Sequence, residues 1–218
     1  MNKIIHNPYC DPSFLRYIDI DSIKVIFEIG MYDGKYTKPI LDVYYNCEQL
    51  HGFECNPAQF DACEKNIHGL DKVKFNKVAL GKEDGIVTFR PCVRGRVAAS
   101  SFYQISDQFE NQSEVSIECK TVNSYCKHEN INAIDLMCID VEGAEMSVFL
   151  GADDLLRNTR YIIVEVQNIY RYLQKIPLRN DVSQFLKDFG FEERFYHGSH
   201  IDDGDPFGDI LYGNKNYD

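Results

Sequence analysis

The sequence VIFEIGMYDG at positions 25–34 places a short apolar run directly before a turn with two glycines, Gly30 and Gly34. The run Val25–Ile29 has the length and composition of a buried β-strand. Pro39 falls in the first turn of the segment that follows, where a missing amide costs little because the first amides of a helix have no partner within it. Apolar residues recur there at helical spacing, at Tyr36, Ile40, Val43 and Tyr44. The stretch therefore predicts a strand, a tight turn and a helix.

Beyond this unit, short apolar runs continue to alternate with helical patterns, which is typical of βαβ units and a mainly parallel sheet. Asn56-Pro57 has the residue types of a helix start, and helices are also expected around Met146–Leu150 and over Val182–Gly190. Further strands are expected at Leu50–Phe53, Val73–Leu80, Ile134–Val141 and Tyr161–Val166.

The middle of the chain departs from this alternation. Glu83-Asp84-Gly85 is expected to form a hairpin turn between the third strand and a strand at Ile86–Phe89. Ser100–Ser113 is polar enough for a surface loop. Val115–Cys119 alternates like an edge or connecting strand.

The end of the chain predicts two strands, Phe191–Tyr196 and Asp209–Tyr212, around a Gly- and Asp-rich loop. They have no helix between them, so we expect an antiparallel edge. No linker interrupts the pattern, and 218 residues suit one domain. We expect residues 1–22 to be an N-terminal lead-in segment and residues 23–218 to be a single domain.

The composition, with 44% apolar and 13% aromatic residues, is that of a folded globular protein. No apolar run reaches 18 residues, and the N-terminus lacks the apolar core of a signal peptide, so we expect a cytoplasmic protein without a membrane span. Eight cysteines include no C-x-x-C pair, which favours reduced thiols over disulfides or a zinc site.

The net charge of −11 would repel a polyanion over most of the surface, so nucleic acid is not an expected partner. Arg94 and Arg96 form a small basic pair in PCVRGRVAASS. They are candidates to hold an anionic group of a substrate, and the alternative is two solvated loop arginines.

Polar residues cluster where the expected strands end. Ligands of open α/β sheets bind beyond the carboxyl ends of the strands, so acidic groups would converge on one crevice that suits hydroxyl-rich or positively charged ligands. The glycine turn would expose backbone amides to the carboxylate of an amino-acid-like ligand. It matches neither the dinucleotide-binding nor the phosphate-loop glycine pattern. The strand-end residues are Glu28, Gly30, Gly34, Glu54, Asp140, Glu142 and Glu165.

Glu54 follows the second strand, roughly two dozen residues after Gly30. An acid at that position can accept hydrogen bonds from both hydroxyls of a ribose. The alternative is a solvated acid before a helix start. The preceding glycine turn favours the ribose hypothesis.

A set of ordered motifs adds a resemblance to these patterns. The stretch Ile139-Asp-Val-Glu-Gly-Ala-Glu145, preceded by Ile134-Asp-Leu-Met, resembles the signature of the FkbM-type methyltransferase family. The other landmarks of that family stand around it in order, as FEIGMYDGKYT, GFECNP, NKVALGKEDGIVTF, ASSF, YIIVEV and GDILY. The resemblance covers roughly Val25 to Tyr212.

The resemblance implies a Rossmann-like class I methyltransferase fold, with a mostly parallel seven-stranded sheet, an antiparallel edge strand and helices on both faces. It implies S-adenosylmethionine as methyl donor and O-methylation of a sugar or other small-molecule hydroxyl, in glycan or natural-product biosynthesis. Two positions depart from the family, since Met31-Tyr32 stand where Ala-Asn is usual and Cys138 stands where lysine is usual.

Carried over by position, Glu28, Gly30 and Gly34 would frame the methionine part of the cofactor. Glu54 would hold the ribose. The remaining positions would be Asn56 and Ala79 near ribose and adenine, and Asp140 and Glu142 beside the donor methyl group and the incoming hydroxyl.

Methyl transfer is an in-line displacement that needs alignment and, for an alcohol, a general base. Asp140 or Glu142 is the expected base, with Glu165 and His197 as further candidates. His197 and His200 are expected in the loop between the last two strands, where either histidine could instead be merely solvated. An alternative is Mg²⁺ held by oxygen ligands, although we expect no metal. Its ligands would be Asp140, Glu165 and Asn168.

Three functions remain open on the sequence alone. The first is a sugar or small-molecule O-methyltransferase. The second is a nucleotide-binding oxidoreductase, which would bind NAD or ATP. The third is a non-catalytic cofactor-binding module, which would bind the cofactor without turnover.

Overall fold

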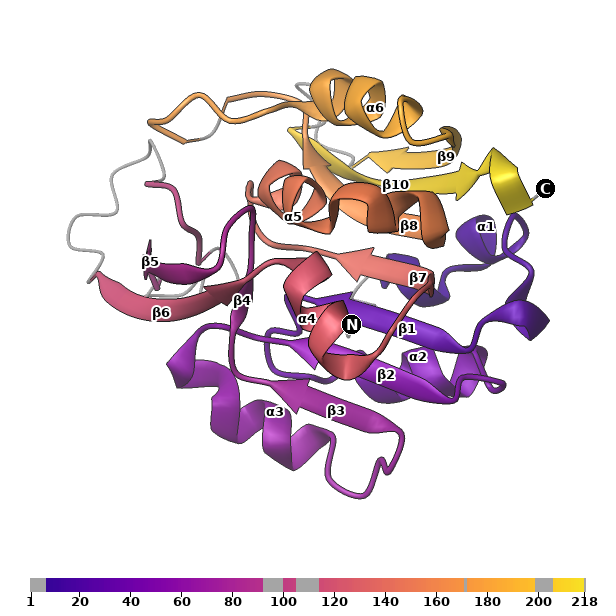
Figure 1. Ribbon diagram of the computed structural model, residues 1–218, viewed down its shortest axis with the longest axis horizontal. Coiled ribbons are helices and arrows are strands. Elements are labelled where there is room, and N and C mark those ends of the chain that lie inside the picture. The colour runs from indigo at the N-terminus through magenta and orange to yellow at the C-terminus, as the bar shows by residue number, and fades with distance from the viewer. Residues whose placement is uncertain (1–6, 92–99, 105–113, 171, 199–205, 218) are drawn as a thin grey trace, which may run out of the picture.

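The computed structural model describes residues 7–91, 100–104, 114–170, 172–198 and 206–217. Within these ranges the main sheet has seven strands in the order β3-β2-β1-β7-β8-β10-β9 (Figure 1). Strands β3, β2, β1, β7 and β8 run parallel to one another, and β10 runs antiparallel to both β8 and β9. The predicted mostly parallel sheet with an antiparallel edge is confirmed. The strands are β1 (Val25–Ile29), β2 (Gln49–Phe53), β3 (Val73–Asn76), β7 (Ile134–Ile139), β8 (Thr159–Gln167), β9 (Phe191–Gly198) and β10 (Phe207–Asn214).

Helices cover both faces of this sheet, as predicted (Figure 1). One face carries α4 (Val122–Glu129), α5 (Glu145–Ala152) and α6 (Arg179–Lys187). The other carries α1 (Pro12–Leu15) and α2 (Thr37–Val43). Helix α3 (Phe60–Asn66) contacts β3 through the rings of Phe60 and Phe75, whose centroids lie 6.1 Å apart. Short 3-10 turns complete the chain at η1 (Pro8–Cys10), η2 (Ile20–Ser22), η3 (Pro57–Gln59), η5 (Asp153–Asn158) and η6 (Lys215–Tyr217).

The central strands are buried on both faces because successive side chains point to opposite sides. In β1, Phe27 packs in the cluster beneath α4 and α5, and its neighbour Ile26 packs in the cluster beneath α1 and α2. In β7, Met137 likewise packs beneath α4 and α5, and Leu136 packs beneath α1 and α2. Continuous apolar runs in the sequence therefore correspond to central strands.

A second, smaller sheet has the order β4-β6-β5, formed by β4 (Ala79–Leu80), β5 (Gly85–Phe89) and β6 (Val115–Lys120). The expected single strand Val73–Leu80 is therefore split into β3 and β4. The hairpin expected at Glu83-Asp84-Gly85 is wrong, because β6 lies between β4 and β5 and pairs with both. Asp84 helps to fix this arrangement, since its Oδ1 accepts a hydrogen bond of 2.6 Å from the amide of Thr121, directly after β6.

Other local predictions are confirmed or corrected. Asn56 caps η3, with Pro57 at its first position, before α3 begins. Ser101, within the expected surface loop Ser100–Ser113, is only 1% exposed and forms an isolated bridge with Arg90, so the loop is not wholly on the surface. Residues 105–113 of that loop lie outside the described ranges.

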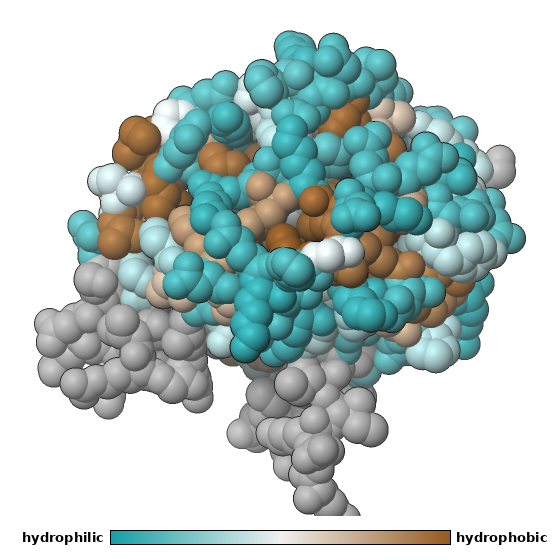
Figure 2. Space-filling model, turned by 90° about the horizontal axis from the view of Figure 1, so that it is seen from below, coloured by the Kyte–Doolittle hydropathy of each residue, from teal (hydrophilic) through white to brown (hydrophobic). Residues whose placement is uncertain are grey.

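The cysteines in the described part of the chain are free thiols, as expected. In the same residues, no helix has the length and apolar character needed to cross a membrane. Figure 2 shows one face of the molecule on which hydrophilic residues predominate and hydrophobic residues are visible between them near the middle.

Candidate active site

A cavity of about 410 Å³ lies at the carboxyl ends of the central strands. Its volume is in the range of small-molecule and cofactor sites. Glu28 of β1, Glu54 after β2 and Asp140 after β7 line it together, so side chains that are far apart in sequence meet there. The predicted site residues that line it are Glu28, Gly30, Glu54, Asn56, Ala79, Asp140, Glu142 and Glu165.

The turn after β1 is built around Gly30, whose φ is +89°. A Cβ there would lie 1.8 Å from the backbone oxygen of Asp140, so only glycine lets β1 and β7 end this close together. The amide of Gly30 donates to the oxygen of Phe53, and that of Tyr32 donates to Glu54. These amides therefore do not face a ligand carboxylate, which corrects that expectation.

Gly34, expected to frame the methionine part of the cofactor, lies against α3 in the structure. It does not line the cavity, and a Cβ there would lie 3.2 Å from Cα of Cys63 in α3. Its φ of +73° also favours glycine. Gly34 thus allows the turn to pack against α3.

Glu54 is 7% exposed and both of its carboxylate oxygens are held by backbone amides. Oε2 accepts a hydrogen bond of 2.8 Å from Tyr32, and Oε1 accepts one of 2.6 Å from Asn56. Each oxygen has a second lone pair, so the carboxylate can still accept hydrogen bonds from a ligand. Glu54 is thus fixed in place at the cavity wall rather than solvated.

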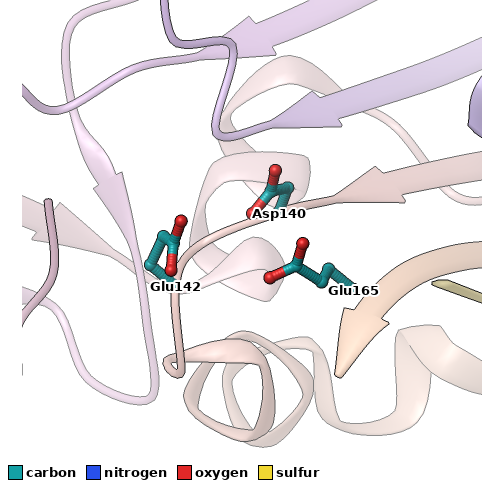
Figure 3. A group of neighbouring side chains, drawn as sticks. All are labelled: Asp140, Glu142 and Glu165. Atoms are coloured by element: carbon teal, nitrogen blue, oxygen red, sulfur yellow. The ribbon is translucent and has the colours of Figure 1, made fainter. Parts of the chain in front are cut away.

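Three carboxylates meet on the side of β1 that lies away from β2 and Glu54. Figure 3 shows the side chains of Asp140, Glu142 and Glu165 converging on one point, and one oxygen of each lies within 4.8 Å of the others. Such a group can share a proton or hold a divalent cation. Asn168, which we expected as a ligand, donates its amide to the hydroxyl of Tyr196 at 2.7 Å and does not line the cavity.

The protein environment raises the pKa of the cavity carboxyl groups, because burial disfavours their charged forms. Asp140 is exposed to the cavity, yet the surrounding protein raises its pKa to about 6. Burial raises the pKa of Glu54 and of Asp209 to about 7. Burial, reinforced by the nearby Asp140, raises the pKa of Glu165 well above its ordinary value. Values near neutrality suit proton transfer at physiological pH.

The loop that carries Glu142 is held in a constrained conformation. Glu142 has a φ of +52°, uncommon outside glycine, and its backbone oxygen accepts a hydrogen bond of 2.6 Å from Ser101. Its Oε2 accepts one of 3.2 Å from the hydroxyl of Tyr172. Gly143 follows with a φ of +97°, and its amide donates to Oε1 of Glu145 at 2.9 Å. Strain of this kind is often found at functional sites.

Several cavity residues were not predicted. Asp209 comes from β10, and Tyr9 comes from the N-terminal segment, so neither follows a parallel strand. Lys35 is the single lysine or arginine among the described lining residues. The sequence offered one signal for Lys35, which is its position directly after Gly34 in the turn that follows β1.

The histidine predictions fare differently. His197 lies within β9, not in a loop, and is absent from the cavity lining. It forms the strand because its neighbours pair along β10 as far as Gly208. His200, Arg94 and Arg96 lie outside the described residues.

Comparison with known proteins identifies the family. The family model for the methyltransferase FkbM domain matches residues 28–193. This chain belongs to the FkbM methyltransferase family. It is therefore an S-adenosylmethionine-dependent methyltransferase, which favours the first of the three hypotheses over the other two.

One relative of this FkbM-family chain is the 2-O-methyltransferase NoeI of Sinorhizobium fredii, 26% identical over 80% of this chain and 75% of the relative. The structure of methyltransferase FkbM from Methylobacillus flagellatus is similar, with a TM-score of 0.56 and 13% identity over 88% of this chain. The chain spans only 44% of that larger protein.

The fold is also that of magnesium protoporphyrin IX methyltransferase from Synechocystis PCC 6803, solved with bound S-adenosylmethionine (TM-score 0.51, 12% identity, 90% of this chain and 72% of that one). It occurs as well in an rRNA methylase from Streptococcus thermophilus (TM-score 0.53, 8% identity, 97% and 98%). Proteins with this fold thus include an enzyme that acts on RNA. The expectation that nucleic acid is not a partner of this FkbM-family chain stays a prediction.

Proposed function

We propose that this chain transfers the methyl group of S-adenosylmethionine to a hydroxyl group of a sugar or other small molecule. The observation that carries the proposal is one cavity with Glu54 on one side of β1 and the three carboxylates Asp140, Glu142 and Glu165 on the other. The first side suits the cofactor, and the second suits a hydroxyl that must lose a proton. The similarity to a 2-O-methyltransferase supports this choice of acceptor.

The cavity residues fit the cofactor. Glu54, fixed by two backbone amides, would accept hydrogen bonds from the ribose hydroxyls. Asn56 and Ala79 would lie beside the ribose and adenine. Lys35 would pair with the carboxylate of the methionine part, because the amides of Gly30, Met31 and Tyr32 in the turn are already bonded within the protein.

Charge also fits. Among the described residues the lining contains one lysine and six carboxyl groups, and a positively charged ligand would favour the ionised forms of these groups. The cofactor supplies an electrophilic methyl group on a cationic sulfur. The lining carboxyl groups are Glu28, Glu54, Asp140, Glu142, Glu165 and Asp209.

Asp140 would act as the general base. Its pKa of about 6 leaves it ionised at neutral pH, and its side chain is exposed to the cavity. The bound cofactor would supply the methyl group to the acceptor oxygen and keep the electron pair of the broken carbon–sulfur bond on its sulfur. The hydroxyl proton passes to Asp140. A positioned base contributes about 10² to 10⁴-fold.

The test is a tritiated-methyl transfer assay with methyl glycosides of common hexoses, deoxyhexoses and pentoses as acceptors. Matched 2-deoxy glycosides report on the position, and rRNA serves as the alternative acceptor. We expect label on glycosides and none on rRNA. Label on rRNA alone, or on no hydroxyl acceptor, would contradict the proposal.

A further inference from the structure

The N-terminal segment contributes to the cavity as well as to the core. Phe14 and Ile18 are buried in the cluster beneath α1 and α2, and Pro8 and Tyr9 line the cavity. A segment that the sequence suggested to be a lead-in thus forms one wall of the site.

Tyr9 is held firmly in that wall. Its amide donates to Oδ1 of Asn7 at 3.1 Å, and its backbone oxygen accepts a hydrogen bond of 3.1 Å from the hydroxyl of Tyr44. The side chain is 6% exposed. Asp11 caps the next helix, with Pro12 at its first position, which limits the freedom of the segment further.

Within the described residues the Tyr9 hydroxyl has no hydrogen-bond partner, and Tyr9 as a whole is 6% exposed. This hydroxyl is not among the fully buried polar atoms without a partner, so it is accessible at the cavity that Tyr9 lines and is free to bond a ligand there. Burial raises the pKa of Tyr9 well above its ordinary value, and the carboxyl groups of Asp140, Asp209 and Glu28 add to the shift. The hydroxyl therefore stays protonated and can donate.

The strand order separates the two ends of the cavity. Glu54 follows β2, on one side of β1 in the sheet. Asp140 follows β7 and Asp209 lies in β10, both on the other side of β1. Tyr9 packs in the core cluster that also holds Cys138 of β7 and Leu211 of β10. These two residues lie close to Asp140 and Asp209 along the chain. The charges of Asp140 and Asp209 also act on Tyr9, in agreement with a hydroxyl at the end assigned to the acceptor.

We propose that Tyr9 is an acceptor-binding residue, whose hydroxyl donates a hydrogen bond to an oxygen of the acceptor next to the reacting hydroxyl. This inference rests on the proposed function and deepens it, because it calls for an acceptor with at least two neighbouring oxygens, as in a sugar. The hydrogen bond orients the acceptor while Asp140 takes the proton.

The test compares Tyr9→Phe, which keeps the ring and removes the hydroxyl, with wild type and with Tyr17→Phe. Tyr17 lies in the same segment, is 42% exposed and does not line the cavity. The probe is the methyl glycoside on which the wild type is most active. Acceptor KM and kcat are measured at saturating S-adenosylmethionine, cofactor Kd by calorimetry and folding by thermal unfolding.

We expect Tyr9→Phe to raise the acceptor KM about five- to tenfold, the effect of one lost hydrogen bond, with cofactor Kd within about twofold of wild type. Tyr17→Phe should match wild type. An unchanged KM, or a loss confined to cofactor Kd, would overturn the inference. A wild-type chain that methylates no glycoside would instead contradict the proposed function, and the inference with it.

Discussion

The amide of Tyr32 donates a hydrogen bond of 2.8 Å to Oε2 of Glu54, which joins the turn after β1 to the end of β2. A single carboxylate thus fixes the turn and presents its remaining lone pairs to the cavity. The geometry of the cofactor end depends on this contact.

Glu54→Ala should weaken S-adenosylmethionine binding at least about tenfold, because charge-assisted hydrogen bonds contribute about 1.5 to 3 kcal/mol. Calorimetry measures the affinity, and Glu48→Ala, at an exposed acid paired with Lys24, is the control. An unchanged affinity would refute the ribose assignment. Thermal unfolding separates lost binding from lost folding.

Lys35→Met should weaken cofactor binding about three- to tenfold, with a smaller difference at high salt, because the Lys35 side chain is 37% exposed and screening reduces its attraction for a carboxylate. Lys38→Met, at a more exposed lysine paired with Asp42, is the control. Equal affinities of Lys35→Met and wild type would remove Lys35 from the cofactor site.

The sequence predicted which strand-end residues meet at the cavity better than it predicted contacts across the fold, for a physical reason. Gly30, Glu54 and Asp140 each follow a parallel strand directly, and parallel strands end at the same edge of a sheet, so their convergence is a local property of the sequence. Ser101 reaches Glu142 across 41 positions. No local periodicity indicates such a contact. None indicates that Tyr9, in the N-terminal segment, lines the cavity.

The same limit explains the wrong hairpin. Gly85 and its flanking acids have the composition of a tight turn, but β5 pairs with β6, which begins only at Val115. Pairing across an intervening loop is a tertiary choice that turn chemistry does not encode.

Asp140→Asn should lower kcat about 10² to 10⁴-fold, because asparagine cannot accept the hydroxyl proton. Cofactor affinity and the unfolding midpoint should change little, since the Asp140 side chain is exposed to the cavity. The wild-type kcat should fall as pH drops through about 6, the pKa of Asp140. Full activity of the variant would rule out an essential base at this position.

The ligand-free protein should unfold at a higher temperature at pH 6 than at pH 8. Burial raises the pKa of Glu28, Glu54 and Asp209 to about 7, above the values of an unfolded chain. Between the pKa values of the unfolded and the folded chain, the folded state binds more protons than the unfolded state. The free energy of unfolding therefore falls as pH rises through about 7. Calorimetric scans that show equal or higher stability at pH 8 would contradict this assignment.

Methyl transfer should continue after dialysis against EDTA, because alignment and a carboxylate base suffice for the displacement. Initial rates before and after dialysis provide the measurement. Loss of activity that Mg²⁺ restores would show that Asp140, Glu142 and Glu165 hold a cation instead.

The most direct measurement is a crystal structure of the chain with S-adenosylhomocysteine. The account predicts the ligand in the cavity between β1 and β2, with its ribose hydroxyls on Glu54 and its sulfur toward Asp140. A ligand bound elsewhere, or a ribose that makes no contact with Glu54, would contradict it.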